Sequence, residues 1–219
     1  FHKANYPKQD PDDGSNIQLT IDLEYQSILQ EELQRRIDES GAKGAMGVLM
    51  DPQNGDILAM ASLPDFDLNN PNMTPLENQK NKVITDQFEP GSTFKIVAAT
   101  AALNTGKISL NDEFNCEVGK FEFDGWTISD HEKFGVLTFP QIIANSSNVG
   151  VIKIAQIIGK EPLYRLSRNY GFGTPTGISF PGESQGILRQ KKDWSKMSLA
   201  SVSIGYEVGV TALQIASAY

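Results

Sequence analysis

The feature that most constrains this chain is the apolar stretch 94–103, in which Lys95 and Thr100 are the only polar side chains. The Pro-Gly pair at 90–91 predicts a turn, and the residues after it predict a helix over 92–103. A helix that is apolar on most of its faces is typical of a buried element. We therefore expect the chain to form a hydrophobic core around this helix, with Lys95 buried in it.

Ser92 and Lys95 lie three residues apart, so on a helix they share a face. Burial disfavours a charged ammonium and lowers the pKa of a lysine. A neutral lysine beside a serine can take the hydroxyl proton, and the free N–H groups of a helix start can stabilise an oxyanion. The same residues also fit an N-cap serine and a surface lysine, and S-x-x-K recurs in the loop segment 40–43.

The composition excludes several classes of function. The net charge of −8 argues against a general nucleic-acid or anionic-membrane surface, and no apolar run reaches the ~18 residues that a membrane helix needs. Cys116 is the only cysteine, and His2 and His131 lie far apart. The sequence therefore predicts no internal disulfide, no metal site and no cofactor.

Hydrophobic periodicity and turn residues divide the chain into a polar linker arm, 1–16, and a folded part, 17–219. The folded part is expected to open with a helix capped by Asp22 and stopped by Gly41, followed by a hairpin of strands 45–50 and 57–62. The later elements are expected to be loops over 63–89 and 111–135, the second pinned by its own aromatic side chains, and helices from Thr138, over 149–158, over 161–170 and from Thr211.

The run Ser146-Ser147-Asn148 falls between two of the predicted helices. A serine and an asparagine two residues apart on a short loop can point into one cleft, where the hydroxyl relays a proton and the amide holds a backbone carbonyl. The alternative is a helix–helix corner that is merely capped by these residues. S-x-N also recurs at 167–169, inside a predicted helix, so the pattern by itself is weak.

A rival motif, G-x-S-x-G, occurs at 182–186. A nucleophile elbow needs a strand before it, a helix after it, and then an acid and a histidine in chain order. Pro181 precedes the motif and no histidine follows Ser184, so this interpretation is rejected.

Several stretches in order resemble the transpeptidase domain of the class B penicillin-binding proteins. The run 88–95 (FEPGSTFK) resembles the first motif of that family with its usual flank, and 146–150 (SSNVG) resembles the second. The family's opening hairpin resembles AMGVLMDP at 45–52 with GDILAMAS at 55–62, and further matches are GFG at 171–173, TGI at 176–178, PGE at 181–183, SIGY at 203–206 and VTALQ at 210–214. The resemblance assigns 17–219 to the N-terminal portion of the transpeptidase domain.

The resemblance implies a β-lactamase/transpeptidase-like α/β (α+β) fold, an antiparallel sheet flanked by helices plus an all-helical subdomain. Only the first two sheet strands are expected in this chain. Members of the family cross-link peptidoglycan as serine-type D,D-transpeptidases through an acyl-enzyme on the D-Ala-D-Ala end of a stem peptide. By resemblance, Ser92 is the nucleophile, Lys95 its base, Ser146 the proton shuttle to the leaving amine, and Asn148 the group that binds the substrate backbone.

The resemblance also implies ligands, partners and a location. The ligands would be peptidoglycan stem peptides and β-lactam antibiotics, and the partners a membrane-embedded glycan polymerase and division or elongation proteins, with no nucleic acid. The location would be the extracytoplasmic face of the bacterial cell membrane, with the anchor segment outside this chain. A role in division, elongation or sporulation stays open, as does the acceptor amine.

One motif of the family is missing, since no Lys-Thr-Gly or Lys-Ser-Gly occurs in the sequence. In the family this motif follows a helix like the one expected from Thr211, and its strand binds the substrate carboxylate and supplies one of two oxyanion N–H groups. The other would come from Ser92. We therefore expect this fragment to be weakly active or inactive, and to expose an unpaired sheet edge through which copies can associate.

Two other functions stay open. A serine β-lactamase or β-lactam sensor shares the motif at 92–95, and a lactamase would differ from a transpeptidase in the short lifetime of its acyl-enzyme. A non-catalytic scaffold would keep the fold for protein contacts alone. Asn148 and the flank 89–91 favour the transpeptidase.

Overall fold

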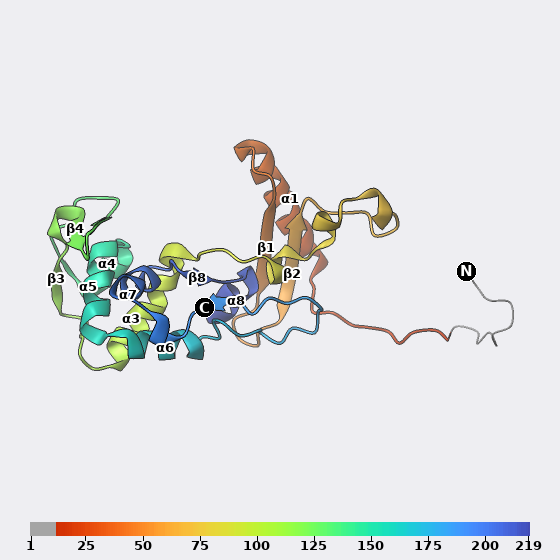
Figure 1. Ribbon diagram of the computed structural model, residues 1–219. Coiled ribbons are helices and arrows are strands. Elements are labelled where there is room, and N and C mark those ends of the chain that lie inside the picture. The colour runs from red at the N-terminus through yellow and green to blue at the C-terminus, as the bar shows by residue number, and fades with distance from the viewer. Residues whose placement is uncertain (1–11) are drawn as a thin grey trace.

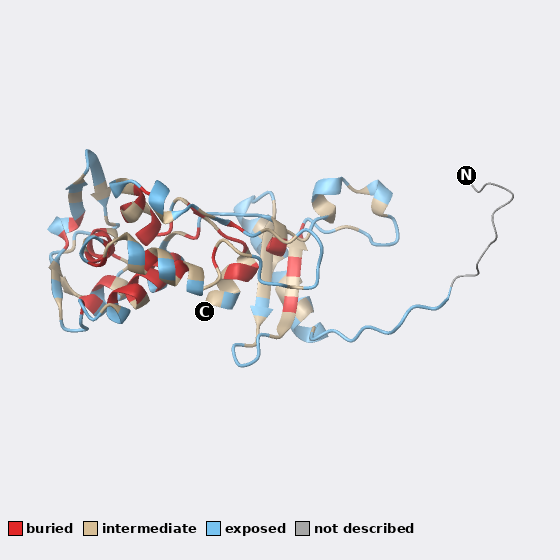
Figure 2. Ribbon diagram, turned by 60° about the horizontal axis from the view of Figure 1, so that its bottom comes forward, coloured by how far each residue is buried: buried red, intermediate tan, exposed pale blue. Residues whose placement is uncertain are grey.

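The computed structural model, whose ribbon is drawn in Figure 1, describes residues 12–219. Two hydrophobic cores of different size organise this part of the chain. The larger core lies among five helices, α3 (Lys95–Asn104), α4 (Phe139–Ala144), α5 (Asn148–Ile158), α6 (Lys160–Asn169) and α7 (Lys196–Ser203). The smaller core joins a β-hairpin to short helices. Figure 2 shows buried residues concentrated in the helical part and along one strand of the hairpin.

The hairpin consists of β1 (Ala45–Met50) and β2 (Ile57–Leu63), which pair antiparallel with Val48 opposite Met60. Strand side chains alternate between the two faces. A Cβ added at Gly47 would lie 2.8 Å from Leu29, so this face packs on α1 (Leu23–Ser40). Met46 and Val48 pack instead on the small core of α2 (Lys82–Thr85) and α8 (Ala212–Ala218). The expected antiparallel strands flanked by helices are thus confirmed.

The predicted ends of α1 are confirmed by its caps. The Asp22 carboxylate accepts from the N–H of Glu24 at 2.9 Å, and Gly41 ends the helix with φ of 67°. The side chain supplies an acceptor for a free N–H of the first turn, and glycine adopts the left-handed conformation at little steric cost. The helix predicted from Thr211 is confirmed as well, since the Thr211 hydroxyl caps α8.

The prediction of a loop over 111–135 is wrong. Besides β3 (Glu113–Asn115), this segment forms a hairpin of β4 (Lys120–Phe123) and β5 (Trp126–Ser129). The turn is Asp124-Gly125, with φ of 51° and 83°, a conformation that Asp-Gly adopts readily in tight hairpins. The aromatic side chains on one face of the hairpin pack against the larger core instead of only against each other.

The remaining strand pairs and 3₁₀ turns are short. They comprise β3 with β6 (Val136–Thr138), β7 (Ile187–Leu188) with β8 (Val208–Gly209), and 3₁₀ turns at Pro71–Met73, Leu76–Gln79, Gly91–Phe94, Glu117–Gly119 and Lys191–Asp193. Helix α7 was not predicted, whereas 63–89 is a loop apart from two of these turns and α2.

The linker arm predicted over 1–16 lies mostly outside the described residues. From residue 12 to residue 20 the chain has neither helix nor strand, so the boundary at residue 16 stays a prediction. Within the described range 12–219, every helix is too short or too polar to cross a membrane.

Candidate active site

Ser92 lies in the 3₁₀ turn Gly91–Phe94, and the α-helix begins only at Lys95. The predicted helix over 92–103 is therefore a 3₁₀ turn followed by α3. Side chains three residues apart eclipse in a 3₁₀ turn, so this geometry stacks Ser92 over Lys95 more directly than an α-helix would. Ser92 is exposed, and its hydroxyl makes no hydrogen bond to any residue between 12 and 219.

Lys95 is the buried cation of the site, with 3% of its surface exposed. Its Nζ donates to the carbonyl oxygen of Ser146 at 2.5 Å and to the Ser146 hydroxyl at 2.9 Å. Desolvation lowers the pKa of Lys95 to about 8, against a smaller opposing effect of the Asp130 carboxylate. Lys95 and Ser146, which are 51 residues apart, are thus brought into direct contact.

The two serines of the second motif serve different purposes. Ser146 has φ of 52°, an uncommon conformation for a residue other than glycine, and its carbonyl and hydroxyl both contact Lys95. Ser147 is the N-cap of α5, where its hydroxyl accepts from the N–H of Gly150 at 3.0 Å. The capping interpretation of this corner is therefore confirmed for Ser147, whereas the catalytic role of Ser146 stays a prediction.

Asn148 is the first residue of α5, one position earlier than the predicted helix start. Its Nδ2 donates to the carbonyl of Ser129 at 3.0 Å. This bond fixes the amide plane, and the Oδ1 atom has no partner among residues 12–219. The open Oδ1 can accept a backbone N–H of a ligand, and the second N–H of Nδ2 is left for the backbone carbonyl that was expected from the sequence.

Asp130 is the residue of this site that the sequence reasoning missed. Its carboxylate accepts from the Ser147 hydroxyl at 2.8 Å, from the Asn148 N–H at 2.5 Å and from the Val149 N–H at 3.1 Å. A carboxylate is well placed at a helix N-terminus, where the backbone N–H groups lack partners. No local signal marks Asp130, because its role depends on the β4–β5 hairpin packing beside α5.

The arrangement can activate a hydroxyl without a metal ion. A neutral amine has two N–H groups and one lone pair, and the two Ser146 acceptors match the two N–H groups. The lone pair then stays available for the proton of a nearby hydroxyl, and Ser92 lies one 3₁₀ turn away. A pKa of about 8 makes the neutral form on the order of 100-fold more abundant at pH 7 than that of an ordinary lysine.

Comparison with known proteins gives a consistent result. The family model of the penicillin binding protein transpeptidase domain matches residues 45–219. The "Probable peptidoglycan D,D-transpeptidase PbpC" of Pseudomonas aeruginosa is 37% identical over 209 residues, which cover 95% of this chain and 37% of that protein. The peptidoglycan D,D-transpeptidase FtsI of Escherichia coli K12 is 35% identical, with 93% and 34% covered.

The fold has close counterparts among solved structures. The transpeptidase domain of penicillin-binding protein 3 from Burkholderia pseudomallei superposes with a TM-score of 0.82 at 32% identity, over 92% of this chain and 56% of that one. A peptidoglycan glycosyltransferase structure from Burkholderia ambifaria gives 0.83 at 31% identity, over 92% and 60%. The chain spans about a third of the length of the curated relatives it matches.

Proposed function

Because this chain belongs to the family of the penicillin binding protein transpeptidase domain, we propose that its protein is a serine-type D,D-transpeptidase that cross-links peptidoglycan. The observation that carries the proposal is the buried Lys95, which contacts Ser146 and follows Ser92 by one turn. A buried amine with a lowered pKa, in contact with one hydroxyl group and one turn away from another, is suited to moving protons in acyl transfer.

In the proposed mechanism, Ser92 Oγ attacks the carbonyl carbon between the two D-Ala residues of a stem peptide. The hydroxyl proton passes to the lone pair of Lys95 Nζ, and the negative charge develops on the carbonyl oxygen. The Ser92 backbone N–H, in the first turn of its helix, provides a donor to that oxyanion.

The leaving group needs a proton before the peptide bond breaks. Ser146 Oγ, 2.9 Å from Lys95 Nζ, gives its proton to the departing D-Ala amine and takes one from the lysine ammonium. Asn148 Oδ1 accepts a backbone N–H of the stem peptide, which holds the scissile bond in place. The amine of a second stem peptide then attacks the acyl-enzyme, and the same groups return the protons.

We also propose the finer assignments of ligand, partner and place. β-Lactams would acylate Ser92, which agrees with the name of the matching family. The protein would act on the extracytoplasmic face of the bacterial membrane with a glycan polymerase and division or elongation proteins. Relatives of 34% to 35% identity are named for peptidoglycan transpeptidation and for sporulation, which supports the reaction but not one particular process.

Association of copies of this chain would use β1 and not β2. The outer edge of β2 is covered, since Gln26 exchanges two hydrogen bonds with the backbone of Met60, at 2.9 and 2.8 Å, and the Asp22 N–H donates to Leu58. Val48 is opposite Met60, so its backbone groups point to the other edge. Within residues 12–219 no strand pairs with that edge of β1.

The test is the intact mass of this chain with and without benzylpenicillin, beside Ser92→Ala. A lasting adduct that Ser92→Ala abolishes supports a penicillin-binding serine enzyme, whereas a short-lived adduct favours a β-lactamase. If the folded chain forms no adduct, the same measurement is made on the full-length protein. Absence of an adduct there would contradict the proposal and favour a scaffold.

A further inference from the structure

The turn that carries Ser92 is held from outside its own helix. Pro90, the N-cap of this turn, makes no side-chain cap bond, and Gly91 has φ of 55°. A short 3₁₀ turn with such a start has little intrinsic stability. The position of the nucleophile therefore depends on what the preceding residues bind.

The segment 88–91 is bound at both of its ends to the segment 205–210. Phe88 and Val210 exchange two backbone hydrogen bonds of 3.0 Å, and the Gly91 N–H donates to the Gly205 carbonyl at 3.1 Å. A Cβ added at Gly205 would lie 2.1 Å from the Gly91 oxygen, so the two backbones are in direct contact.

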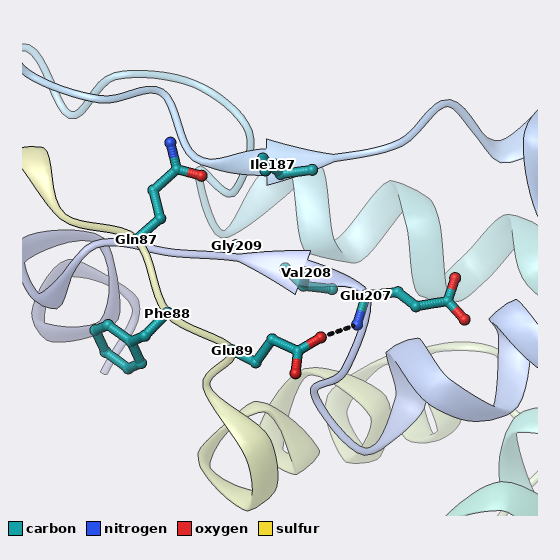
Figure 3. A pocket seen from close by; sticks show the side chains of 7 residues that line it. All are labelled: Gln87, Phe88, Glu89, Ile187, Glu207, Val208 and Gly209. Atoms are coloured by element: carbon teal, nitrogen blue, oxygen red, sulfur yellow. Dashed lines mark hydrogen bonds between the residues drawn. The ribbon is translucent and has the colours of Figure 1, made fainter.

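Between these two attachments, the side chain of Glu89 makes the only further hydrogen bond to the segment 205–210 in the described structure. Its carboxylate accepts the backbone N–H of Glu207 at 2.9 Å, beside a cavity of about 330 Å³ (Figure 3). Glu207 has φ of 58°, uncommon for a residue other than glycine, so its N–H has a fixed and unusual direction. The Glu207 carboxylate is itself paired with Arg189, which leaves Glu89 to bind the backbone.

We propose that Glu89 is a positioning residue for the nucleophile: by accepting the Glu207 N–H, its side chain clamps the backbone before Ser92 against the segment 205–210. The inference rests on the proposed function, because it assigns Ser92 as the nucleophile. Its physical basis is that small displacements of a reacting group lower the rate strongly.

The clamp requires an acceptor atom and not a charge. A glutamine at position 89 keeps a side-chain oxygen at the same distance along the chain, whereas an alanine removes it. An electrostatic role of Glu89 would be lost in both variants. The pair Glu89→Gln and Glu89→Ala therefore separates the two roles.

The experiment measures acylation by a chromogenic penicillin in the full-length protein, with the binding constant and the acylation rate constant determined separately. We expect Glu89→Ala to slow acylation about tenfold or more with little change in binding, and Glu89→Gln to stay within about twofold of wild type. General misfolding would lower the fraction of protein labelled instead of the rate. Glu113→Ala, which removes an exposed glutamate from β3, is the matched control.

Amide hydrogen exchange provides a readout that does not depend on activity. In Glu89→Ala the N–H groups of Glu207 and Gly91 should exchange faster, and in Glu89→Gln they should stay protected. Equal acylation rates in the two Glu89 variants, or unchanged exchange of Glu207 in Glu89→Ala, would overturn the clamp. If the wild type is not acylated at all, the proposed function is wrong, and the exchange of Glu207 alone decides whether the clamp exists.

Discussion

Replacing Lys95 by methionine should abolish acylation and yet stabilise the protein at neutral pH. Burial lowers the pKa of Lys95 from 10.5 to about 8, which corresponds to about 3 kcal/mol of destabilisation when the lysine is charged. The substitution also removes two hydrogen bonds to Ser146, each contributing about 1 kcal/mol. Methionine fills the same space without a charge. At pH 7 the variant should thus be more stable by about 1 kcal/mol.

The sign of this difference should reverse at high pH. Between pH 8 and pH 10.5 an unfolded lysine still holds a proton that the folded Lys95 has lost, so the stability of the wild type rises with pH in this window. Above pH 10.5 the lysine is neutral in both states, and only the lost hydrogen bonds count. There Lys95→Met should be less stable than wild type by about 2 kcal/mol.

The assay is urea unfolding of both proteins at several pH values from 7 to 11, compared as a difference so that other titrating groups cancel. Lys196→Met, an exposed substitution on α7, controls for the loss of one positive charge. A difference that stays constant over this range would refute the reasoning. So would a Lys95→Met variant that is less stable than wild type at pH 7, because the burial of Lys95 would then cost little.

Two further predictions concern Asp130 and the open edge of β1. Asp130→Asn should lower the maximal acylation rate by about 10- to 100-fold, because the N–H groups of Asn148 and Val149 lose their charged acceptor. Asp130→Asn should also move the acid limb of the pH–rate profile to lower pH, since the Asp130 carboxylate raises the pKa of Lys95. The control is Asp124→Asn on the same hairpin. An acid limb that moves to higher pH would contradict this account. For the edge, sedimentation should detect dimers of this chain that Val48→Pro removes and Val48→Ala keeps, because proline deletes an outward N–H. A chain that stays monomeric at high concentration would show that the edge does not pair.

The sequence predicted well the elements whose signals are local. The caps at Asp22 and Gly41 and the turn between β1 and β2 were visible as residue types at fixed spacing, and the structure confirms them. The β4–β5 hairpin was missed although Asp124-Gly125 is a strong turn signal, because the aromatic residues around it were interpreted as a self-contained cluster. They pack on the larger core, and that contact cannot be derived from the segment alone.

In the candidate site, too, some residues could be predicted from local sequence patterns and others only from the tertiary structure. The four residues expected to react or bind are marked by two motifs, because the two members of each pair must lie at a fixed short spacing along the chain. The contacts of the neighbouring carboxylates are not marked: Asp130 reaches Ser147 from 17 residues away, and Glu89, although it lies in the flank of the first motif, reaches Glu207 across 118 residues. Both accept backbone N–H groups next to the motifs. Because any segment brought close by the fold can supply such an acceptor or donor, the partners of these two carboxylates follow from the tertiary structure and not from a motif.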